Sequence, residues 1–320
     1  MPDPRTVSDR LEVAPEVRAA LAAGRPVVAL ESTLISHGLP YPQNLDVARA
    51  SEAAVRATGA IPATVAIRDG RLLVGLDKAG LEALATAPAG SVPKAARPSL
   101  AMALAAGGWA ATTVSATMIA AHAAGIRVFA TGGIGGVHRG ALGGAGGRGG
   151  RHATFDVSSD LEELASTPMA VVCAGPKAIL DVSATLEYLE TRGVPVIAVG
   201  QDELPGFFAR SAGVSAPAFV ADVRGAAAVV AAQLGLGLRA GIVVCVPVPP
   251  DAALPDDIAR EAVGRAVHEA DDAGITGPAL TPWLLARIAT LTGGASVRAN
   301  TALIVNNART AGELATLLGG

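Results

Sequence analysis

Short apolar runs rich in β-branched residues alternate along this chain with longer, alanine-rich segments of helical periodicity. Such alternation is typical of a mainly parallel sheet that carries helices on both faces. We therefore expect a three-layer α/β/α fold with a mainly parallel central sheet. The predicted strands are Pro26–Leu30, Thr64–Ile67, Arg127–Ala130, Ala170–Ala174, Pro195–Val199 and Ile242–Val246.

The segments between these strands carry helical patterns, and nothing in them divides the chain. There is no internal repeat and no linker long enough to force a domain boundary, so we expect a single domain over residues 1–320. The glycine-rich stretch Leu142–Arg151 has too little apolar surface to order itself and is expected to be a flexible insertion. The predicted helices are Glu16–Ala23, Leu45–Thr58, Leu81–Thr86, Leu100–Ala106, Thr113–Ala124, Asp160–Ser166, Lys177–Arg192, Gly225–Gln233, Pro255–Ala273, Pro282–Thr292, Val297–Ala308 and Ala311–Leu318.

The composition argues against several classes of function. The net charge is −3 and no run of lysine and arginine occurs, so the chain has no electrostatic footprint for nucleic acid or a membrane surface. Residues Pro98–Ile126 lack charged side chains, but a Gly-Gly break and several hydroxyl groups argue against a membrane-spanning helix. Cys173 and Cys245 lie in apolar strand-like runs and are expected to be reduced. With no signal peptide at the polar N-terminus, these features predict a cytoplasmic protein.

Lysine is scarce in this chain, which makes its three positions informative. The 25 basic residues comprise 22 arginines and the lysines Lys78, Lys94 and Lys177. A desolvated lysine can lose its proton and act as a nucleophile, whereas arginine stays protonated. Pro176 is suited to the first position of a helix, so Lys177 is expected next to a helix N-terminus, where the helix dipole disfavours positive charge. Coding bias alone would also account for the scarcity, and Lys78 in a polar turn fits that interpretation.

Polar residues follow several predicted strands, at the edge where open parallel sheets bind ligands. Glu31 follows the first strand, Thr131 and His138 follow the third, and Lys177 follows the fourth. Glu31 considered alone fits a capping or ion-paired carboxylate as well as a catalytic one. Neither Gly132–Gly136 nor the glycine-rich insertion gives a strand–glycine–helix nucleotide fingerprint, so nucleotide binding is not expected.

Two aspartates, Asp156 and Asp160, lie four residues apart beside hydroxyl side chains. Oxygen ligands of this kind suit a hard cation such as Mg²⁺ or Mn²⁺ rather than zinc. Ser159 has a structural explanation, because Ser159-x-x-Glu162 fits a capping box at the start of a helix.

Long blocks of this sequence resemble the pseudouridine-5′-phosphate glycosidase family, which includes the indigoidine-cluster homologues. The resemblance covers nearly the whole chain and implies a three-layer α/β/α fold. The blocks that carry it are Ala29–Asn44, Pro62–Ile67, Ala130–Gly140, Thr154–Leu161, Val171–Lys177, Leu186–Val196 and Ala299–Ala308.

The resemblance implies a role for each candidate residue. Lys177 would attack C1′ of the sugar, Glu31 would be the proton donor, and Asp156 would bind Mn²⁺. The implied reaction reversibly cleaves the carbon–carbon glycosidic bond of pseudouridine 5′-phosphate into uracil and ribose 5-phosphate, through a lysine imine with the ring-opened sugar. The resemblance also implies a homotrimer. Substrate contacts would fall on Lys94, Val114, Ser158, Ser159 and Asp160, with Thr131, His138 and Asn300 also lining the site.

Two other functions would use the same residues. An imine-forming lyase or aldolase that acts on another phosphosugar needs the same lysine, acid and anion site. A non-catalytic sugar-phosphate-binding protein needs the site without the nucleophile. The chain also departs from the family pattern at the Leu142–Arg151 insertion, at Val246, where the family usually has asparagine, and at Pro278, where a lysine is often found.

Overall fold

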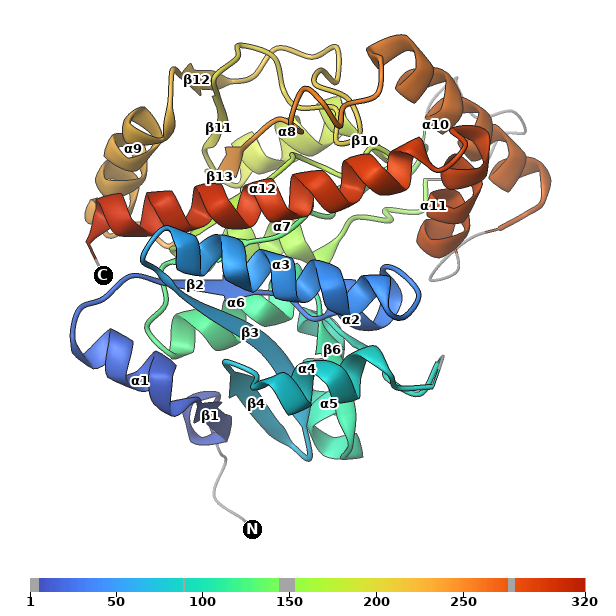
Figure 1. Ribbon diagram of the computed structural model, residues 1–320. Helices are drawn as coiled ribbons and strands as arrows, with labels where there is room; N and C mark the ends of the chain where they lie inside the picture. Colours follow the sequence, from blue (N-terminus) through green and yellow to red (C-terminus); the bar gives the residue numbers. More distant parts are fainter. Residues whose placement is uncertain (1–5, 89, 144–152, 276–279, 320) are drawn as a thin grey trace.

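The computed structural model describes residues 6–88, 90–143, 153–275 and 280–319. A large, mainly parallel sheet runs through the middle of the molecule, and helices cover both of its faces (Figure 1). Its strand order is β1-β4-β3-β2-β7-β9-β13-β11-β12, and β6 pairs with β3 and β5 at one side. The bounds are β1 Leu11–Val13, β2 Val27–Leu30, β3 Ile61–Arg68, β4 Arg71–Val74, β5 Lys94–Ala95, β6 Trp109–Thr112, β7 Val128–Ala130, β9 Ala170–Cys173, β11 Val196–Val199, β12 Ala218–Val220 and β13 Ile242–Cys245.

Strand β3 joins two parts of this sheet. Its first half pairs in parallel with β2, and its second half pairs antiparallel with β4 and β6. From β2 to β12 every pairing is parallel, so the carboxyl ends of these strands meet at one edge. A second, two-stranded sheet forms from β8 (Val137–His138) and β10 (Leu180–Asp181). All six predicted strands are confirmed, with bounds that shift by up to three residues.

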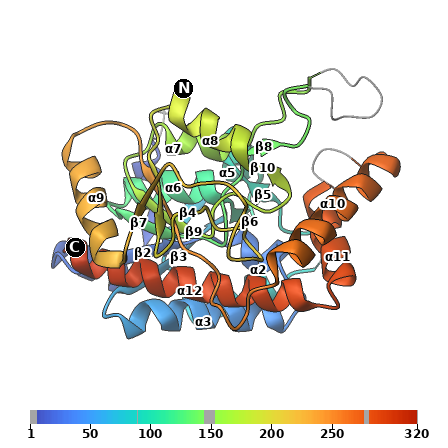
Figure 2. The same ribbon diagram turned by 90° about the horizontal axis from the view of Figure 1, so that it is seen from above.

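Side chains alternate between the two faces of the sheet, and each face has its own layer of helices. On β2, Val27 and Ala29 pack into the core under one layer of helices, whereas Val28 and Leu30 pack into the core under the other layer. Figure 2 shows these two layers on opposite sides of the sheet, which confirms the three-layer α/β/α prediction. The first layer contains α1 (Pro15–Ala22), α6 (Val114–Ala123), α7 (Ser159–Leu164) and α8 (Val182–Thr191), and the second contains α3 (Gln43–Ala57), α9 (Val223–Gly235) and α12 (Ala295–Leu318).

Two further groups of helices lie beside these layers. Helices α10 (Asp256–Asp272) and α11 (Leu280–Leu291) pack with the first half of α12 around a third apolar core. Helices α2 (Thr33–His37) and α4 (Lys78–Ala85) enclose a fourth, smaller one, while α5 (Leu100–Ala106) packs beside β5.

The helices predicted at Leu100–Ala106 and Thr113–Ala124 are confirmed as α5 and α6, whereas one strand was not predicted and the expectation of two C-terminal helices is wrong. The region Pro98–Ile126 contains not only α5 and α6 but also β6, which pairs with β3 although its Trp-Ala-Ala-Thr sequence is a weak strand former. The two helices expected near the C-terminus are one continuous helix, α12, because no proline interrupts it. A Cβ at Gly312 would lie 2.3 Å from Oγ1 of Thr58, so the glycine allows α12 to pack closely on the end of α3.

Most of the glycine-rich insertion, residues 144–151, and Pro278 lie outside the described residues. Within the described ranges, no helix is both long and apolar enough to span a membrane.

Candidate active site

The ends of β2, β7 and β9 bring the predicted residues to one edge of the sheet. The segments that follow β7 and β9 stay paired beyond the strands themselves. The Thr131 N–H donates to the Val172 carbonyl at 3.0 Å, and the Ala174 N–H donates to Gly132 at 2.9 Å. A further bridge joins Ile134 to Pro176. These backbone contacts hold the segments after β7 and β9 side by side at the site.

Glu31 is fixed by the residues on both sides of it. Ser32 Oγ accepts a hydrogen bond from the Thr112 N–H at 3.0 Å, and Thr33 Oγ1 donates to the Thr112 carbonyl at 2.9 Å. These bonds tie the start of α2 to β6. The Thr131 hydroxyl donates to Glu31 Oε1. The backbone that follows Glu31 is therefore tied to β6, and its carboxyl group is held by Thr131 at the end of β7.

The surroundings of Glu31 favour its protonated form. Desolvation raises the pKa of its carboxyl group above the ordinary value, and the charge of Asp160 acts in the same direction. The positive charge of Lys177, the hydrogen bond from Thr131 and the charge of Lys94 oppose this shift but do not cancel it. A carboxyl group with a raised pKa is suited to proton donation near neutral pH.

Two of the three lysines in the chain converge on Glu31. Desolvation and the charge of Lys177 both lower the pKa of the Lys94 amine, and Glu31 partly opposes them. Lys78, by contrast, is exposed at the start of α4. The fold thus separates the two functional candidates from the third lysine, as the sequence predicted.

The backbone around Lys177 differs from the prediction. Helix α8 begins only at Val182, because residues 176–181 form the bridge to Ile134 and strand β10 instead. The Lys177 N–H donates to the Ile134 carbonyl at 3.1 Å, and the Lys177 carbonyl accepts from Leu180 at 2.9 Å. The expected position at a helix N-terminus is therefore wrong. A braced loop places this side chain, and the helix dipole does not act on it.

Asp160 connects three segments of the site. It is 5% exposed, its Oδ1 accepts from the Ser115 N–H at 3.0 Å, and its Oδ2 accepts from the Gly135 N–H at 2.9 Å. A Cβ at Gly135 would lie 2.2 Å from Ser158 Oγ, so only glycine allows this close approach. Gly135 therefore serves close packing of the backbone against Ser158 and Asp160.

Ser158, not Ser159, caps α7. Ser158 Oγ accepts from the Asp160 N–H at 3.2 Å, while Ser159 Oγ lies 3.4 Å from Ser115 Oγ. The predicted capping box is wrong because Glu162 faces α8, where its carboxylate accepts from Tyr188 and Arg192. Both serines lie next to Asp160, and their contact with substrate stays a prediction.

The Asp156 side of the site is open to solvent. The Asp156 side chain is 50% exposed, and its Oδ2 lies 3.9 Å from Nδ1 of His138, whose side chain is 22% exposed. The His138 N–H also donates to the Asp156 carbonyl at 3.0 Å. Among the described residues, no three His, Cys, Asp or Glu side chains form a metal-binding group.

This donor set fits a cation that keeps most of its water. Mn²⁺ and Mg²⁺ bind to one or two carboxylates and complete their coordination with water or phosphate, whereas a structural zinc site needs four protein ligands. The oxygens of Asp160 already accept from two backbone N–H groups, so Asp156 is the candidate ligand of the pair. The donor set thus fits Mn²⁺ through Asp156 alone.

The remaining predicted contacts lie around this cluster. Val114 is the first residue of α6, and its side chain is buried, so it presents only its backbone to a ligand. Asn300 lies on α12 one turn before Ile304, which packs against Gly132.

Sequence reasoning missed two residues of the site. Asn307 is fully buried, and its Nδ2 donates to the carbonyls of Thr131 at 2.9 Å and Gly132 at 3.3 Å. His37 lies on α2, and desolvation together with the charge of Lys94 lowers its pKa. Both residues belong to blocks that carry the family resemblance, which was the available signal. Their contacts arise because α12 and α2 lie at this edge of the sheet. The spacing of residues along the sequence does not predict such contacts.

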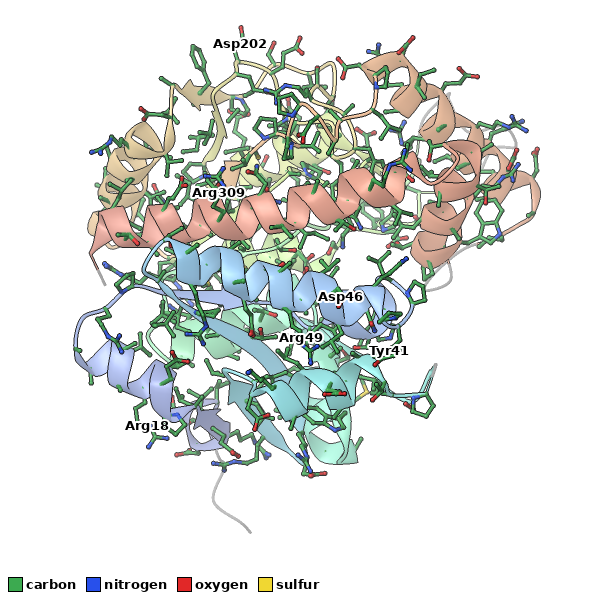
Figure 3. All side chains as sticks on the ribbon, in the orientation of Figure 1. Arg18, Tyr41, Asp46, Arg49, Asp202 and Arg309 are labelled. Carbon is green, nitrogen blue, oxygen red and sulfur yellow. The ribbon has the colours of Figure 1, made fainter. Side chains whose placement is uncertain are left out.

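A groove of about 730 Å³ lies elsewhere, between α3 and α12. Asp46 and Arg309, which line it, are visible on these two helices in Figure 3. No predicted catalytic, metal or substrate residue lines this groove, so its size does not identify it as the active site. The cluster around Glu31 and Lys177 remains the candidate site because the reactive groups meet there.

Comparison with known proteins shows the family of this chain. The family described as "Indigoidine synthase A like protein" matches residues 16–317. The chain is 53% identical over 308 residues to the pseudouridine-5′-phosphate glycosidase of Paracoccus denitrificans, covering 96% of this chain and 98% of that protein. It is 54% identical over 308 residues to the pseudouridine-5′-phosphate glycosidase of Solibacter usitatus, covering 96% of this chain and 99% of the relative.

Solved structures with the same fold include enzymes and relatives of this family. The prealnumycin C-glycosynthase AlnA, crystallised with ribulose 5-phosphate, is 39% identical with a TM-score of 0.85, and 97% of each chain is covered. An indigoidine synthase A-like protein from Thermotoga maritima is 31% identical with a TM-score of 0.82, and coverage is again 97% of each chain.

Proposed function

Because this chain belongs to the indigoidine synthase A-like family, we propose that it is a pseudouridine-5′-phosphate glycosidase. It reversibly cleaves the carbon–carbon bond between ribose 5-phosphate and uracil. The observation that carries the proposal is the convergence of Glu31, Lys94 and Lys177 at one edge of the sheet, in a chain with only three lysines. The names of the full-length relatives support the same substrate.

A carbon leaving group explains why the site contains a lysine as well as an acid. Ordinary glycosidases protonate a heteroatom and use two carboxylates. Uracil in pseudouridine is bound through carbon, so protonating a glycosidic heteroatom cannot release it. An amine attached to C1′ supplies an electron pair that expels the base, and Lys177 is placed to provide that amine.

The proposed reaction passes through a covalent bond between Lys177 and the sugar. The neutral Lys177 amine bonds to C1′ while the bond to the ring oxygen breaks, and that oxygen takes the proton of Glu31. Bonding to C1′ leaves the nitrogen positively charged. It gives up one proton, its freed electron pair forms a protonated imine as the C1′–C5 bond breaks, and the C5 carbon of uracil takes that proton. Water finally adds to the imine and releases ribose 5-phosphate, which restores the amine. The raised pKa of Glu31 keeps it protonated for the first of these steps.

The charged groups around the nucleophile are suited to the rest of the substrate. Lys94 provides a cation for the 5′-phosphate, and its charge acts on Glu31 in the same cluster. Thr131 orients the Glu31 carboxyl group through its hydroxyl. Val114, Ser158, Ser159, Asp160, His138 and Asn300 are proposed to surround the sugar.

We also propose Mn²⁺ as the cofactor, held by Asp156. Its chemistry in such a site is to order phosphate and water oxygens by its charge. Asp156 is half exposed and lies beside His138, which leaves room for water ligands. A homotrimeric assembly remains part of the proposal. So does a cytoplasmic location, which the free, buried thiols of Cys173 and Cys245 support.

Two experiments separate this function from its alternatives. Incubation with pseudouridine 5′-phosphate and Mn²⁺ should release uracil, measured by chromatography. Borohydride added with ribose 5-phosphate should leave a mass adduct on the peptide that contains Lys177. An imine-forming aldolase would give the adduct without uracil release, and a sugar-phosphate-binding protein would give neither. An adduct on Lys94 would contradict the assignment of the nucleophile.

A further inference from the structure

A small cavity adjoins Glu31, and the charged residues Lys94, Asp160 and Lys177 do not line it. Its volume is about 20 Å³, and its polar lining consists of Glu31, Ser51, Thr64 and Thr131. The rest of the lining is apolar or glycine. A space of this size holds one water molecule, and a buried water needs two to four polar partners. Lys94, Asp160 and Lys177 do not line it, so it is distinct from the proposed substrate side.

Each hydroxyl group around the cavity already donates a hydrogen bond to another protein atom. Ser51 Oγ donates to the Val47 carbonyl at 2.8 Å, and the Thr131 hydroxyl donates to Glu31. The Thr64 hydroxyl donates to Glu52 Oε1 at 2.6 Å. Each oxygen is therefore left as an acceptor. A water in the cavity would accept from protonated Glu31 and donate to Thr64 and to a second hydroxyl.

Glu52 connects this arrangement to the outside of the molecule. It lies on α3 one turn after Ala48, which lines the cavity, and its side chain is partly exposed. Desolvation raises the pKa of its carboxyl group; the hydrogen bond from Thr64 and the charge of Arg56 lower it, and the charge of Glu16 raises it. Glu52 thus accepts a hydrogen bond from a buried hydroxyl group and is itself partly exposed to solvent.

We propose that Glu52 exchanges protons with Glu31 through Thr64 and one water molecule bound in this cavity. In the direction of the hydrogen bonds described, the Glu31 proton passes to the water, a water proton passes to Thr64 Oγ1, and the Thr64 hydroxyl proton passes to Glu52. Glu31 ends as a carboxylate and Glu52 as an acid, while the water and Thr64 remain neutral. Rotation of the Thr64 hydroxyl and the water allows the reverse transfer.

Such a route matters because the proposed reaction uses the Glu31 proton once in every turnover. Substrate bound beside Lys94, Asp160 and Lys177, whose charges act on Glu31, would leave the cavity free, because none of these three residues lines it. A water molecule in the cavity could return a proton to Glu31 before the products leave the substrate side. The inference rests on the proposed function only in taking Glu31 as the reacting acid.

Kinetic measurements on the full-length protein test the relay. Glu52→Gln and Thr64→Val should each lower kcat by about 10-fold with little change in KM, since proton transfer, not binding, is impaired. They should also change the alkaline limb of the pH profile and increase the solvent isotope effect. Thr64→Ser should recover most of the turnover lost in Thr64→Val. Glu82→Gln, an exposed position on α4, is the matched control.

Chemical rescue distinguishes a relay from a structural role. Glu52→Ala should lose turnover, and formate buffer should restore part of it in proportion to its concentration, because a small acid can reach Thr64 from solvent. A purely structural role predicts a lower melting temperature and no dependence on formate. If kcat of Glu52→Gln stays within twofold of wild type across the pH range, the relay is excluded.

Infrared titration gives a result that does not depend on turnover. If a water links the two acids, Thr64→Val should shift the protonated carboxyl bands of both Glu31 and Glu52, assigned with the Glu→Gln variants. If only the Glu52 band shifts, no water connects them and the proposal fails. A wild-type protein that releases no uracil would overturn the proposed function, and the infrared result would still decide the connectivity.

Discussion

The two sides of the candidate site differ in their access to water. On one side, Thr64 and Thr131 are 2% and 3% exposed, and they surround the carboxyl group of Glu31 with protein. On the other side, Asp156 and His138 are 50% and 22% exposed. Desolvation raises the pKa of Glu31, whereas Asp156 can keep water around a bound cation or phosphate.

This difference shows how one site can perform two tasks. Proton donation near neutral pH needs a carboxyl group that resists ionisation, which burial supplies. Metal and phosphate binding need exposed oxygens and charges that exchange readily with solvent. Lys177 lies on the loop between β9 and β10, which pairs with the segment after β7, so the nucleophile is near both sides.

The largest effect should come from substitution of Lys177, the proposed nucleophile, which lies near both sides of the site. Lys177→Arg keeps the charge but cannot form an imine, so turnover should fall by roughly 10⁴-fold or more. Uracil release and borohydride trapping are the measurements. Lys78→Arg makes the same substitution at an exposed lysine and should behave like wild type. Substantial turnover in Lys177→Arg would show that no imine is needed.

The buried side is tested next through Glu31. Glu31→Gln keeps the shape and the hydrogen bond from Thr131 but cannot donate a carboxyl proton. We expect kcat to fall roughly 10²–10⁴-fold while the affinity for ribose 5-phosphate changes little. In the wild type, the rate should decline as pH rises through the raised pKa of Glu31, and this limb should vanish in the variant. A variant that retains the limb would assign the acid to another residue.

The open side should respond to metal. Asp156→Asn should weaken Mn²⁺ binding by roughly 10–100-fold, a range seen when groups that support a metal are altered. Electron paramagnetic resonance of Mn²⁺ measures this directly. EDTA should inactivate the wild type, and Mn²⁺ should restore it better than Zn²⁺. Full activity in metal-free protein would mean that the open side binds substrate without a metal ion.

A smaller effect should come from the residue that anchors the buried side. Asn307→Leu removes the donor to the buried Thr131 carbonyl, at a cost of about 1–3 kcal/mol, whereas the Gly132 carbonyl keeps its bond from the Ala174 N–H. Because Thr131 orients Glu31, kcat should also fall by about 10-fold. Asn306→Leu, at the neighbouring position where the amide makes a weaker bond, is the control. Equal kcat in both variants would limit Asn307 to a structural role.

The smallest effect concerns stability and follows from the sign of the Glu31 shift. A raised pKa means that the native state holds the proton more tightly than the unfolded state. Burial of this carboxyl group therefore costs stability as pH rises from the ordinary value through the raised one. Glu31→Gln should melt at a higher temperature than wild type above that window, and the gain should disappear below it. Calorimetry at several pH values measures the difference.

The sequence by itself determined the layered fold and the residues that we propose to carry the chemistry. Strands and most helices have strong local signals, and the alternation of the two defines a parallel sheet. Glu31, Thr131 and Lys177 could be placed at one edge because they follow parallel strands. The weakly patterned β6 could not be predicted, since its strand conformation comes from pairing with β3.

Tertiary structure alone decided how these residues are held and what surrounds them. Local pattern favoured a helix at Lys177, but pairing with Ile134 and His138 satisfies the same backbone groups in a braced loop. The contacts of Asn307 and the cavity shared by Glu31 and Thr64 join segments far apart in the chain. Burial and the resulting pKa shifts depend on all the atoms packed around a group, and no local sequence window contains those atoms.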